Sequence, residues 1–186
     1  MEFSMENLTR RRFLQSCALA APGLLLSDRL LAAVPPEAAG TRALTFHHTH
    51  TGERLSAEYF SGGSYVADAL AAINRHLRDF RTGEEHVIDP ALLDLLHRLN
   101  RLTGSHKPFQ VISGFRSPKT NQLLRAQSHG VAAGSLHMVG KAIDIRLADV
   151  PLPKLQAAAL TLRAGGVGYY PLPDFVHVDT GRVRTW

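Results

Sequence analysis

The chain has 186 residues, of which 45% are hydrophobic and 20% charged, and its formal net charge is +5. These values are typical of a single globular domain and argue against a disordered or membrane-embedded chain. The basic residues of the body are scattered, so we expect no nucleic-acid partner. Cys17 is the only cysteine and lies near the N-terminus. The body therefore has neither a disulfide framework nor a cysteine nucleophile.

Residues 1–33 are predicted to be a twin-arginine signal peptide. Residues 9–14 read Thr-Arg-Arg-Arg-Phe-Leu, and an apolar run (17–26) and a small-residue site (32–33) follow. The run is too short to span a bilayer comfortably, and the arginine motif argues against an amphipathic cytosolic helix. We expect a periplasmic protein that is exported by the twin-arginine pathway, with no stable membrane insertion after signal cleavage.

Residues 34–41 are predicted to be a linker, and residues 42–186 the folded domain. Helical and strand patterns follow one another in the domain without a regular β-α-β period. This favours an α+β fold, a single domain with a mainly antiparallel sheet flanked by helices. The predicted strands are a hairpin (42–49 and 53–60), a strand at 109–112, a strand from Ile143, and strands at 166–170 and 175–179. Two helices are predicted from their caps, one from Ser64 to about Phe80 and one from Asp89 to before Gly104. Two more are predicted from Ser117-Pro118 to about Gln127 and at 153–163.

Three histidines, His47, His48 and His50, cluster in the predicted hairpin. They are candidate metal ligands, but His47 and His48 point to opposite faces of a strand and no acidic residue accompanies them. We expect them to be solvated hairpin residues.

His137, Asp144 and His177 form a more promising set. Asp144 lies seven residues after His137 at the start of an alternating apolar/polar segment, and His177 lies in a second alternating segment, Phe175–Asp179. Two imidazoles and one carboxylate suit Zn²⁺, and three protein ligands leave a fourth position for water. The sequence therefore indicates a catalytic zinc site.

A strand-to-helix turn at residues 113–117 (Ser-Gly-Phe-Arg-Ser) places Arg116 at its apex. Such turns often carry functional side chains, and arginine can bind a substrate carboxylate through two hydrogen bonds. The alternative is that Arg116 ties the turn to carbonyl groups or to an internal acid.

Together these motifs resemble the LAS metallopeptidases, the group of the lysostaphin-type enzymes, the D-Ala-D-Ala carboxypeptidases and the hedgehog domain. The resemblance rests on Ser113–Ser117, on the pattern Ser135-x-His137-x-x-Gly-x-Ala-x-Asp144, on Phe175–Asp179 and on a Gly-Gly-Val-Gly-Tyr-Tyr-Pro run at 165–171. It covers residues 43–186 and is strongest for exported murein endopeptidases. It implies zinc bound by His137, Asp144 and His177, with Arg116 steadying the substrate or the oxyanion.

Two aspartates are candidates for the catalytic general base. The resemblance favours Asp174, because many relatives place an acid three residues before the last histidine ligand. Strand alternation favours Asp179, which shares a face with His177 and could instead orient its imidazole. We rank Asp174 first.

The resemblance also implies peptidoglycan as the partner and hydrolysis of its peptide cross-links as the reaction. The alternatives are a D,D- or L,D-carboxypeptidase that trims stem peptides, and a non-catalytic, zinc-stabilised module that binds peptidoglycan. We expect a monomer. The sequence does not distinguish between cross-link types.

Overall fold

A computed structural model describes residues 40–127 and 131–186, so the predicted signal peptide and most of the predicted linker lie outside the described residues. The described part contains an eight-stranded sheet with the order β3-β2-β1-β4-β5-β7-β6-β8. Its strands are β1 (Arg42–His48), β2 (Arg54–Ser61), β3 (Ser64–Tyr65), β4 (Phe109–Ser113), β5 (Ala142–Arg146), β6 (Gly166–Tyr170), β7 (Phe175–Asp179) and β8 (Arg184–Thr185).

Most neighbouring strands of the sheet pair antiparallel, and only β1–β4 and β6–β8 pair in parallel. The predicted α+β fold with a mainly antiparallel sheet is confirmed. The helices are α1 (Ala67–His76), α2 (Pro90–Thr103), α3 (Pro118–Gln127) and α4 (Leu152–Leu162). None of the helices in the described ranges is long and apolar enough to cross a membrane.

The first helix is shorter than its sequence pattern predicts. Ser64 does not cap α1. It belongs to β3, where it pairs with Ser61 of β2, and Val66 is the extended residue before the helix. At the other end the carbonyl of Leu77 accepts a hydrogen bond from the backbone N–H of Phe115 at 2.7 Å. These pairings to β2 and to the 113–117 turn fix both ends. The second helix, by contrast, begins and ends as predicted, with an Asp89 cap and a left-handed Gly104.

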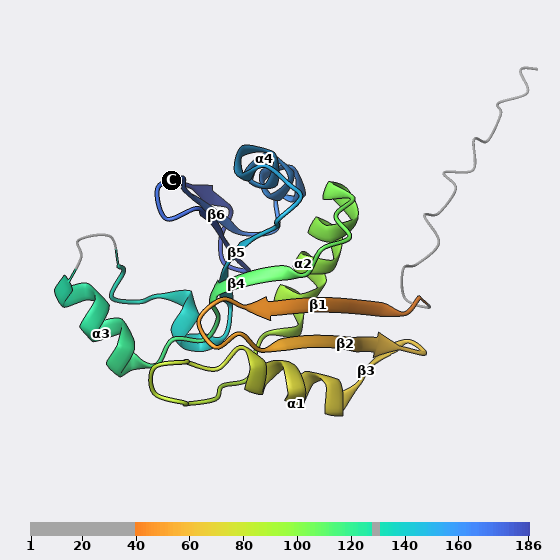
Figure 1. The fold of residues 1–186 in the computed structure, drawn as a ribbon, viewed down its shortest axis with the longest axis horizontal. Helices are drawn as coiled ribbons and strands as arrows, with labels where there is room; N and C mark the ends of the chain where they lie inside the picture. The colour runs from red at the N-terminus through yellow and green to blue at the C-terminus, as the bar shows by residue number, and fades with distance from the viewer. Residues whose placement is uncertain (1–39, 128–130) are drawn as a thin grey trace, which may run out of the picture. The chain divides into compact units, whose positions relative to one another are not determined.

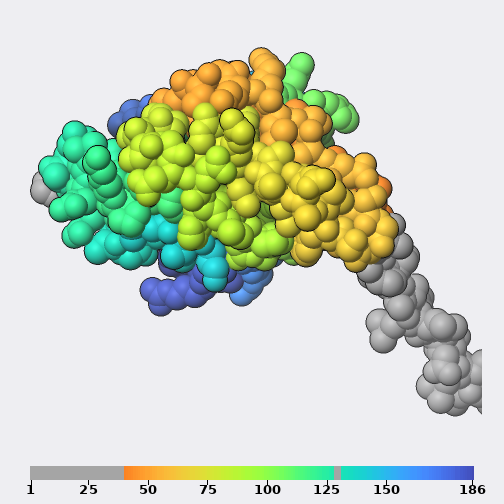
Figure 2. Space-filling model, turned by 90° about the horizontal axis from the view of Figure 1, so that it is seen from below, coloured from red at the N-terminus to blue at the C-terminus, as the bar shows by residue number. Residues whose placement is uncertain are grey.

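One hydrophobic core joins the helices to one face of the sheet. Residues of α1, α2 and α4 pack with the alternate strand residues Phe46, Val111, Ile143 and Val178. Figure 1 shows α2 beside β1 and β4, and α4 beside β6. In Figure 2 α1 and the loop after it lie side by side with the hairpin strands. Because strand side chains alternate, residues such as Asp144 and His177 project from the opposite face.

The expectation that the hairpin histidines are solvated is wrong for His48. Its side chain is 1% exposed, because strand alternation places it on the core face with Leu44 and Phe46. Its ring contacts Phe80, with centroids 5.5 Å apart, and His76 at 6.1 Å. Burial, with repulsion from the His76 and His50 side chains, lowers the pKa of His48 to about 4. His48 is therefore a neutral core residue.

This burial predicts an acid-sensitive stability. Unfolded His48 binds a proton below about pH 6.5, whereas folded His48 does so only near pH 4, so the free energy of unfolding falls as the pH drops through that window. Urea unfolding at pH 7 and pH 4.5 is expected to show that His48→Phe removes roughly 2 kcal/mol of the wild-type pH dependence. Equal acid losses in both proteins would contradict this account.

Candidate metal centre

Three polar side chains from separate elements meet on the sheet face opposite the core. Asp144 on β5 and His177 on β7 are directly paired across the antiparallel register, which brings their side chains together. His137 lies in a short 3-10 helix, η2 (Leu136–Val139), just before β5. That helix ends at Gly140 with φ +66°, where a Cβ atom would collide with the carbonyl oxygen of Val87. The fold therefore requires glycine at this position of the predicted motif.

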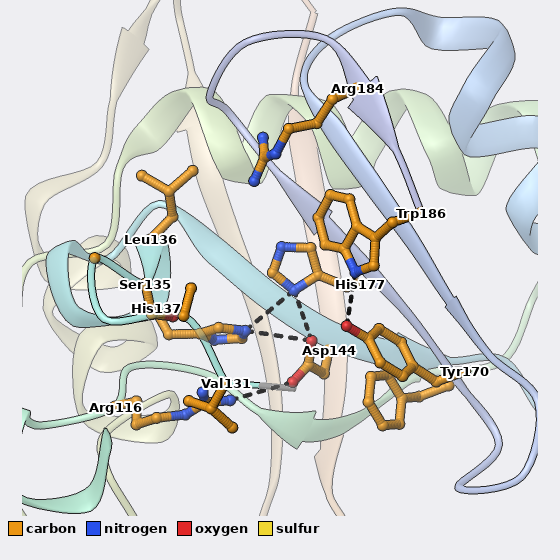
Figure 3. Close-up of a pocket in the computed structure, with 13 residues that line it drawn as sticks. Arg116, Val131, Ser135, Leu136, His137, Asp144, Tyr170, His177, Arg184 and Trp186 are labelled. Atoms are coloured by element: carbon orange, nitrogen blue, oxygen red, sulfur yellow. Dashed lines mark hydrogen bonds and ion pairs between the residues drawn. The ribbon is translucent and has the colours of Figure 1, made fainter. Parts of the chain in front are cut away.

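The ligand atoms of this cluster lie at the spacing that a small cation needs. His137 Nε2 is 3.2 Å from His177 Nδ1 and 3.3 Å from Asp144 Oδ1, and His177 Nδ1 is 2.9 Å from Asp144 Oδ1. Figure 3 shows the three side chains converging. All three residues are buried, and they form the one group of metal-binding type within residues 40–127 and 131–186.

The outer nitrogen of each imidazole has a partner that can only accept a hydrogen bond. His137 Nδ1 donates to the carbonyl oxygen of Gly114 at 2.8 Å, and His177 Nε2 donates to Asp179 Oδ2 at 3.1 Å. In the neutral rings the inner nitrogens therefore carry lone pairs. Two nitrogen lone pairs and a carboxylate oxygen thus point at one another. That arrangement is repulsive unless a proton or a metal cation lies between them.

Asp179 is completely enclosed, with an exposure of 0%. Besides His177, its carboxylate accepts hydrogen bonds from the backbone N–H groups of Gly166 and Gly181 and from two guanidinium nitrogens of Arg184. A carboxylate so engaged has no free position for a water proton. Its contact with the His177 ring favours the second of the two roles considered for Asp179, orienting the imidazole.

The side chains of the cluster also shift the pKa values of Asp144 and His177. Burial would raise the pKa of Asp144, but the charges and hydrogen bonds of the two imidazoles hold it well below its usual range. Burial lowers the pKa of His177, but the hydrogen bonds to Asp144 and Asp179 outweigh burial, and the net pKa is raised. Asp144 is therefore ionised, as a metal ligand must be.

Arg116 lies beside the cluster as predicted. Its guanidinium Nη2 is 3.6 Å from Asp144 Oδ2, and the side chain is 12% exposed. Its backbone N–H donates to the carbonyl oxygen of His137, which ties the 113–117 turn to η2. Its Nε has no hydrogen-bond partner within the described chain. Arg116 can therefore still bind an anionic group, although it also contacts an internal acid.

The structure does not bring Asp174 to this cluster. The turn places it at φ +56°, and its carboxylate pairs with Arg146 Nη1 at 2.9 Å with 57% of the side chain exposed. It lines a second hollow on the sheet, together with Gln110 and Arg146. Asp174 lies in the turn before β7, and its ion pair with Arg146 holds the carboxylate away from the cluster.

The cluster forms the floor of a pocket of about 400 Å³. Its aromatic side, Tyr170, Phe175 and Trp186, was not identified by sequence reasoning. Phe175 shares a face with His177, and Tyr170 follows from the register that pairs Gly168 with His177. The other lining residues are Arg116, Val131, Ala132, Gly134, Ser135, Leu136 and Arg184.

A buried His-Asp-His cluster at the floor of a pocket, on a mainly antiparallel α+β domain, is a candidate metal site. Residues 36–186 match the family described as peptidoglycan L,D-endopeptidase MepK, and the chain belongs to this family. It is 49% identical over 145 residues to the peptidoglycan L,D-endopeptidase MepK of Escherichia coli K12, which covers 78% of this chain and 80% of that protein. It is 42% identical over 178 residues to the probable peptidoglycan L,D-endopeptidase MepK of Haemophilus influenzae, which covers 95% of each chain.

Proposed function

We propose that this protein is a zinc-dependent endopeptidase that hydrolyses peptide cross-links of peptidoglycan in the periplasm. The observation that carries the proposal is the meeting of three lone-pair atoms of His137, Asp144 and His177 at 2.9–3.3 Å on the floor of the pocket. The names of the relatives favour a bond between an L-centre and a D-centre as the one cleaved. Export by the twin-arginine pathway and a monomeric state belong to the same proposal.

The donor set fits Zn²⁺. Ligands bonded at about 2.0–2.1 Å to a tetrahedral zinc ion lie about 3.3 Å from one another, close to the spacing here. A bound zinc ion would supply a Lewis acid for the peptide carbonyl and a water molecule of lowered pKa. The chain itself holds the three ligand atoms and fixes the His177 ring through Asp179.

Arg116 contributes positive charge to the same pocket. It lies at the edge of the cluster, and burial lowers its pKa while the nearby Asp144 carboxylate opposes that shift. A guanidinium is the side chain best suited to bind a carboxylate with two hydrogen bonds. The stem peptides of peptidoglycan carry carboxylates next to the cleaved bond, so this position suits both substrate binding and stabilisation of the oxyanion.

The test combines metal analysis with digestion of peptidoglycan. About one zinc per chain and new uncross-linked muropeptides are expected for the mature wild-type domain. Zinc without any product would favour the peptidoglycan-binding module, and loss of terminal residues from uncross-linked stems would favour the carboxypeptidase. A folded protein that binds no zinc would overturn the proposal.

The same assay tests Asp174 as the general base. Because its carboxylate pairs with Arg146 outside the pocket, Asp174→Asn is expected to leave the cleavage rate within about two-fold of wild type. The exposed ion pair contributes little to stability, so the free energy of unfolding is expected to change by less than about 1 kcal/mol. A rate loss of a hundred-fold or more would instead assign the base to Asp174.

A further inference from the structure

The aromatic side of the pocket is built by a strand pairing that no local pattern indicates. The backbone of Trp186 is held against β6 by hydrogen bonds to Val167 and Tyr169. Its indole covers Gly168, where a Cβ atom would collide with the ring. The indole centroid lies 5.2 Å from that of His177, and the Tyr170 ring stacks on Phe175 at 4.5 Å. This wall therefore adjoins the ligand cluster directly.

The Tyr170 hydroxyl oxygen accepts a hydrogen bond, and its proton can be donated to a further group. The indole Nε1–H of Trp186 donates to the phenol oxygen at 2.7 Å. Within the described residues, Trp186 is the only hydrogen-bond partner of this hydroxyl. A hydroxyl that accepts from one donor is polarised and becomes a better donor itself. Figure 3 shows it pointing towards Asp144 and His177, on a different side of the cluster from Arg116.

The remaining lining offers little other proton chemistry. Apart from the three ligands, its ionisable side chains in the described chain are Arg116, Tyr170 and Arg184. Arg184 is bound to Asp179 by both terminal nitrogens, at 2.7 and 3.1 Å. Arg116 is a cation beside Asp144. Tyr170 is therefore the one described lining residue that carries a phenol O–H.

We infer that Tyr170 is a catalytic residue that donates a hydrogen bond to the oxygen of the scissile carbonyl as negative charge develops there. Trp186 is a positioning residue, because its indole N–H fixes the phenol so that the hydroxyl proton faces the substrate. The inference rests on the proposed peptidase function. Arg116 and Tyr170 would then hold the oxyanion from two sides, one as a cation and the other as a neutral donor.

The test uses Tyr170→Phe, which keeps the ring and removes the hydroxyl. The matched control is Tyr169→Phe, on the neighbouring residue, whose ring packs against the core. With a purified cross-linked muropeptide and the zinc-loaded enzyme, Tyr170→Phe is expected to lower kcat about 100-fold with KM within two-fold, as for loss of an oxyanion donor. Tyr169→Phe is expected to keep both constants.

The role of Trp186 is tested by combining variants. Trp186→Phe alone is expected to lower kcat about ten-fold, and to have no further effect when Tyr170→Phe is already present. The chain has one tryptophan, so its single indole N–H resonance reports the hydrogen bond without any assay of activity. We expect this resonance to move upfield in Tyr170→Phe.

Two outcomes would overturn the assignment while leaving the peptidase function intact. One is a kcat of Tyr170→Phe within two-fold of an active wild type. The other is a loss that appears only in KM, which would make Tyr170 a substrate-binding residue. A zinc-loaded wild type that cleaves no cross-linked muropeptide would overturn the proposed function itself, and the catalytic role of Tyr170 with it.

Discussion

Replacing His177 by alanine is expected to abolish metal binding and to lower peptidoglycan cleavage by at least a thousand-fold. The substitution removes one of the three proposed ligand atoms. It also removes the imidazole N–H that donates a hydrogen bond to the buried Asp179. Two remaining ligands do not make a stable site for zinc. Zinc content measured on the purified protein, together with muropeptide profiles of digested peptidoglycan, checks both parts of the expectation.

The control for this variant is His106→Ala. His106 is exposed, and only its backbone N–H contacts Asp149, so the substitution removes an imidazole without touching the cluster. It is expected to retain full zinc content and full activity. A His177→Ala protein that still carries one zinc per chain would show that the ion binds elsewhere, and the proposed site would have to be abandoned.

Replacing Asp179 by alanine is expected to have the largest effect on stability. The change leaves buried donors of Gly166 and His177, and part-buried donors of Gly181 and Arg184, without their shared acceptor. Removing one partner of a buried ionic network costs about 3–5 kcal/mol. Loss of the group that orients a metal-binding histidine weakens metal binding about 10- to 100-fold. Urea unfolding of the metal-free protein and competition with a zinc chelator measure the two effects separately.

Asp179→Asn separates charge from shape. The amide keeps the size of the side chain and one acceptor oxygen but has no negative charge for Arg184 or His177. We expect a stability loss smaller than that of the alanine variant, with zinc affinity still reduced. Should both variants keep wild-type stability and wild-type zinc affinity, the role of Asp179 in holding the His177 ring would be refuted.

Much of the fold can be predicted from local patterns. Two-residue alternation places β7 and the Asp144 segment correctly, and capping residues such as Asp89 and Gly104 mark both ends of α2. Where the prediction is wrong, a contact with another part of the fold determines the structure of the residue. Ser64 joins a strand because β2 offers it a partner, and His48 is buried because α1 and the loop after it cover the face on which it lies.

One part of the candidate site could be predicted from local sequence patterns, and another part depends on tertiary contacts. The His137–Asp144 spacing and the alternation around His177 are sequence patterns, so the cluster could be predicted. The wall of Tyr170 and Trp186 could not, because it depends on the parallel addition of β8 to β6. The position of Asp174 could not be predicted, because it depends on the turn before β7 and on an ion pair with Arg146 of β5.

The bonds of Asp179 bear on how such a pocket can change during evolution. One carboxylate holds both the ring of His177 and the guanidinium of Arg184, two residues before the tryptophan of the wall. Changes to the β8 side therefore disturb the ligand cluster, and selection on catalysis constrains both together. The facing segment, residues 131–135, is joined to α3 through Asn121 and the carbonyl of Ala132. New substrate preferences should arise, and be most readily engineered, on that side.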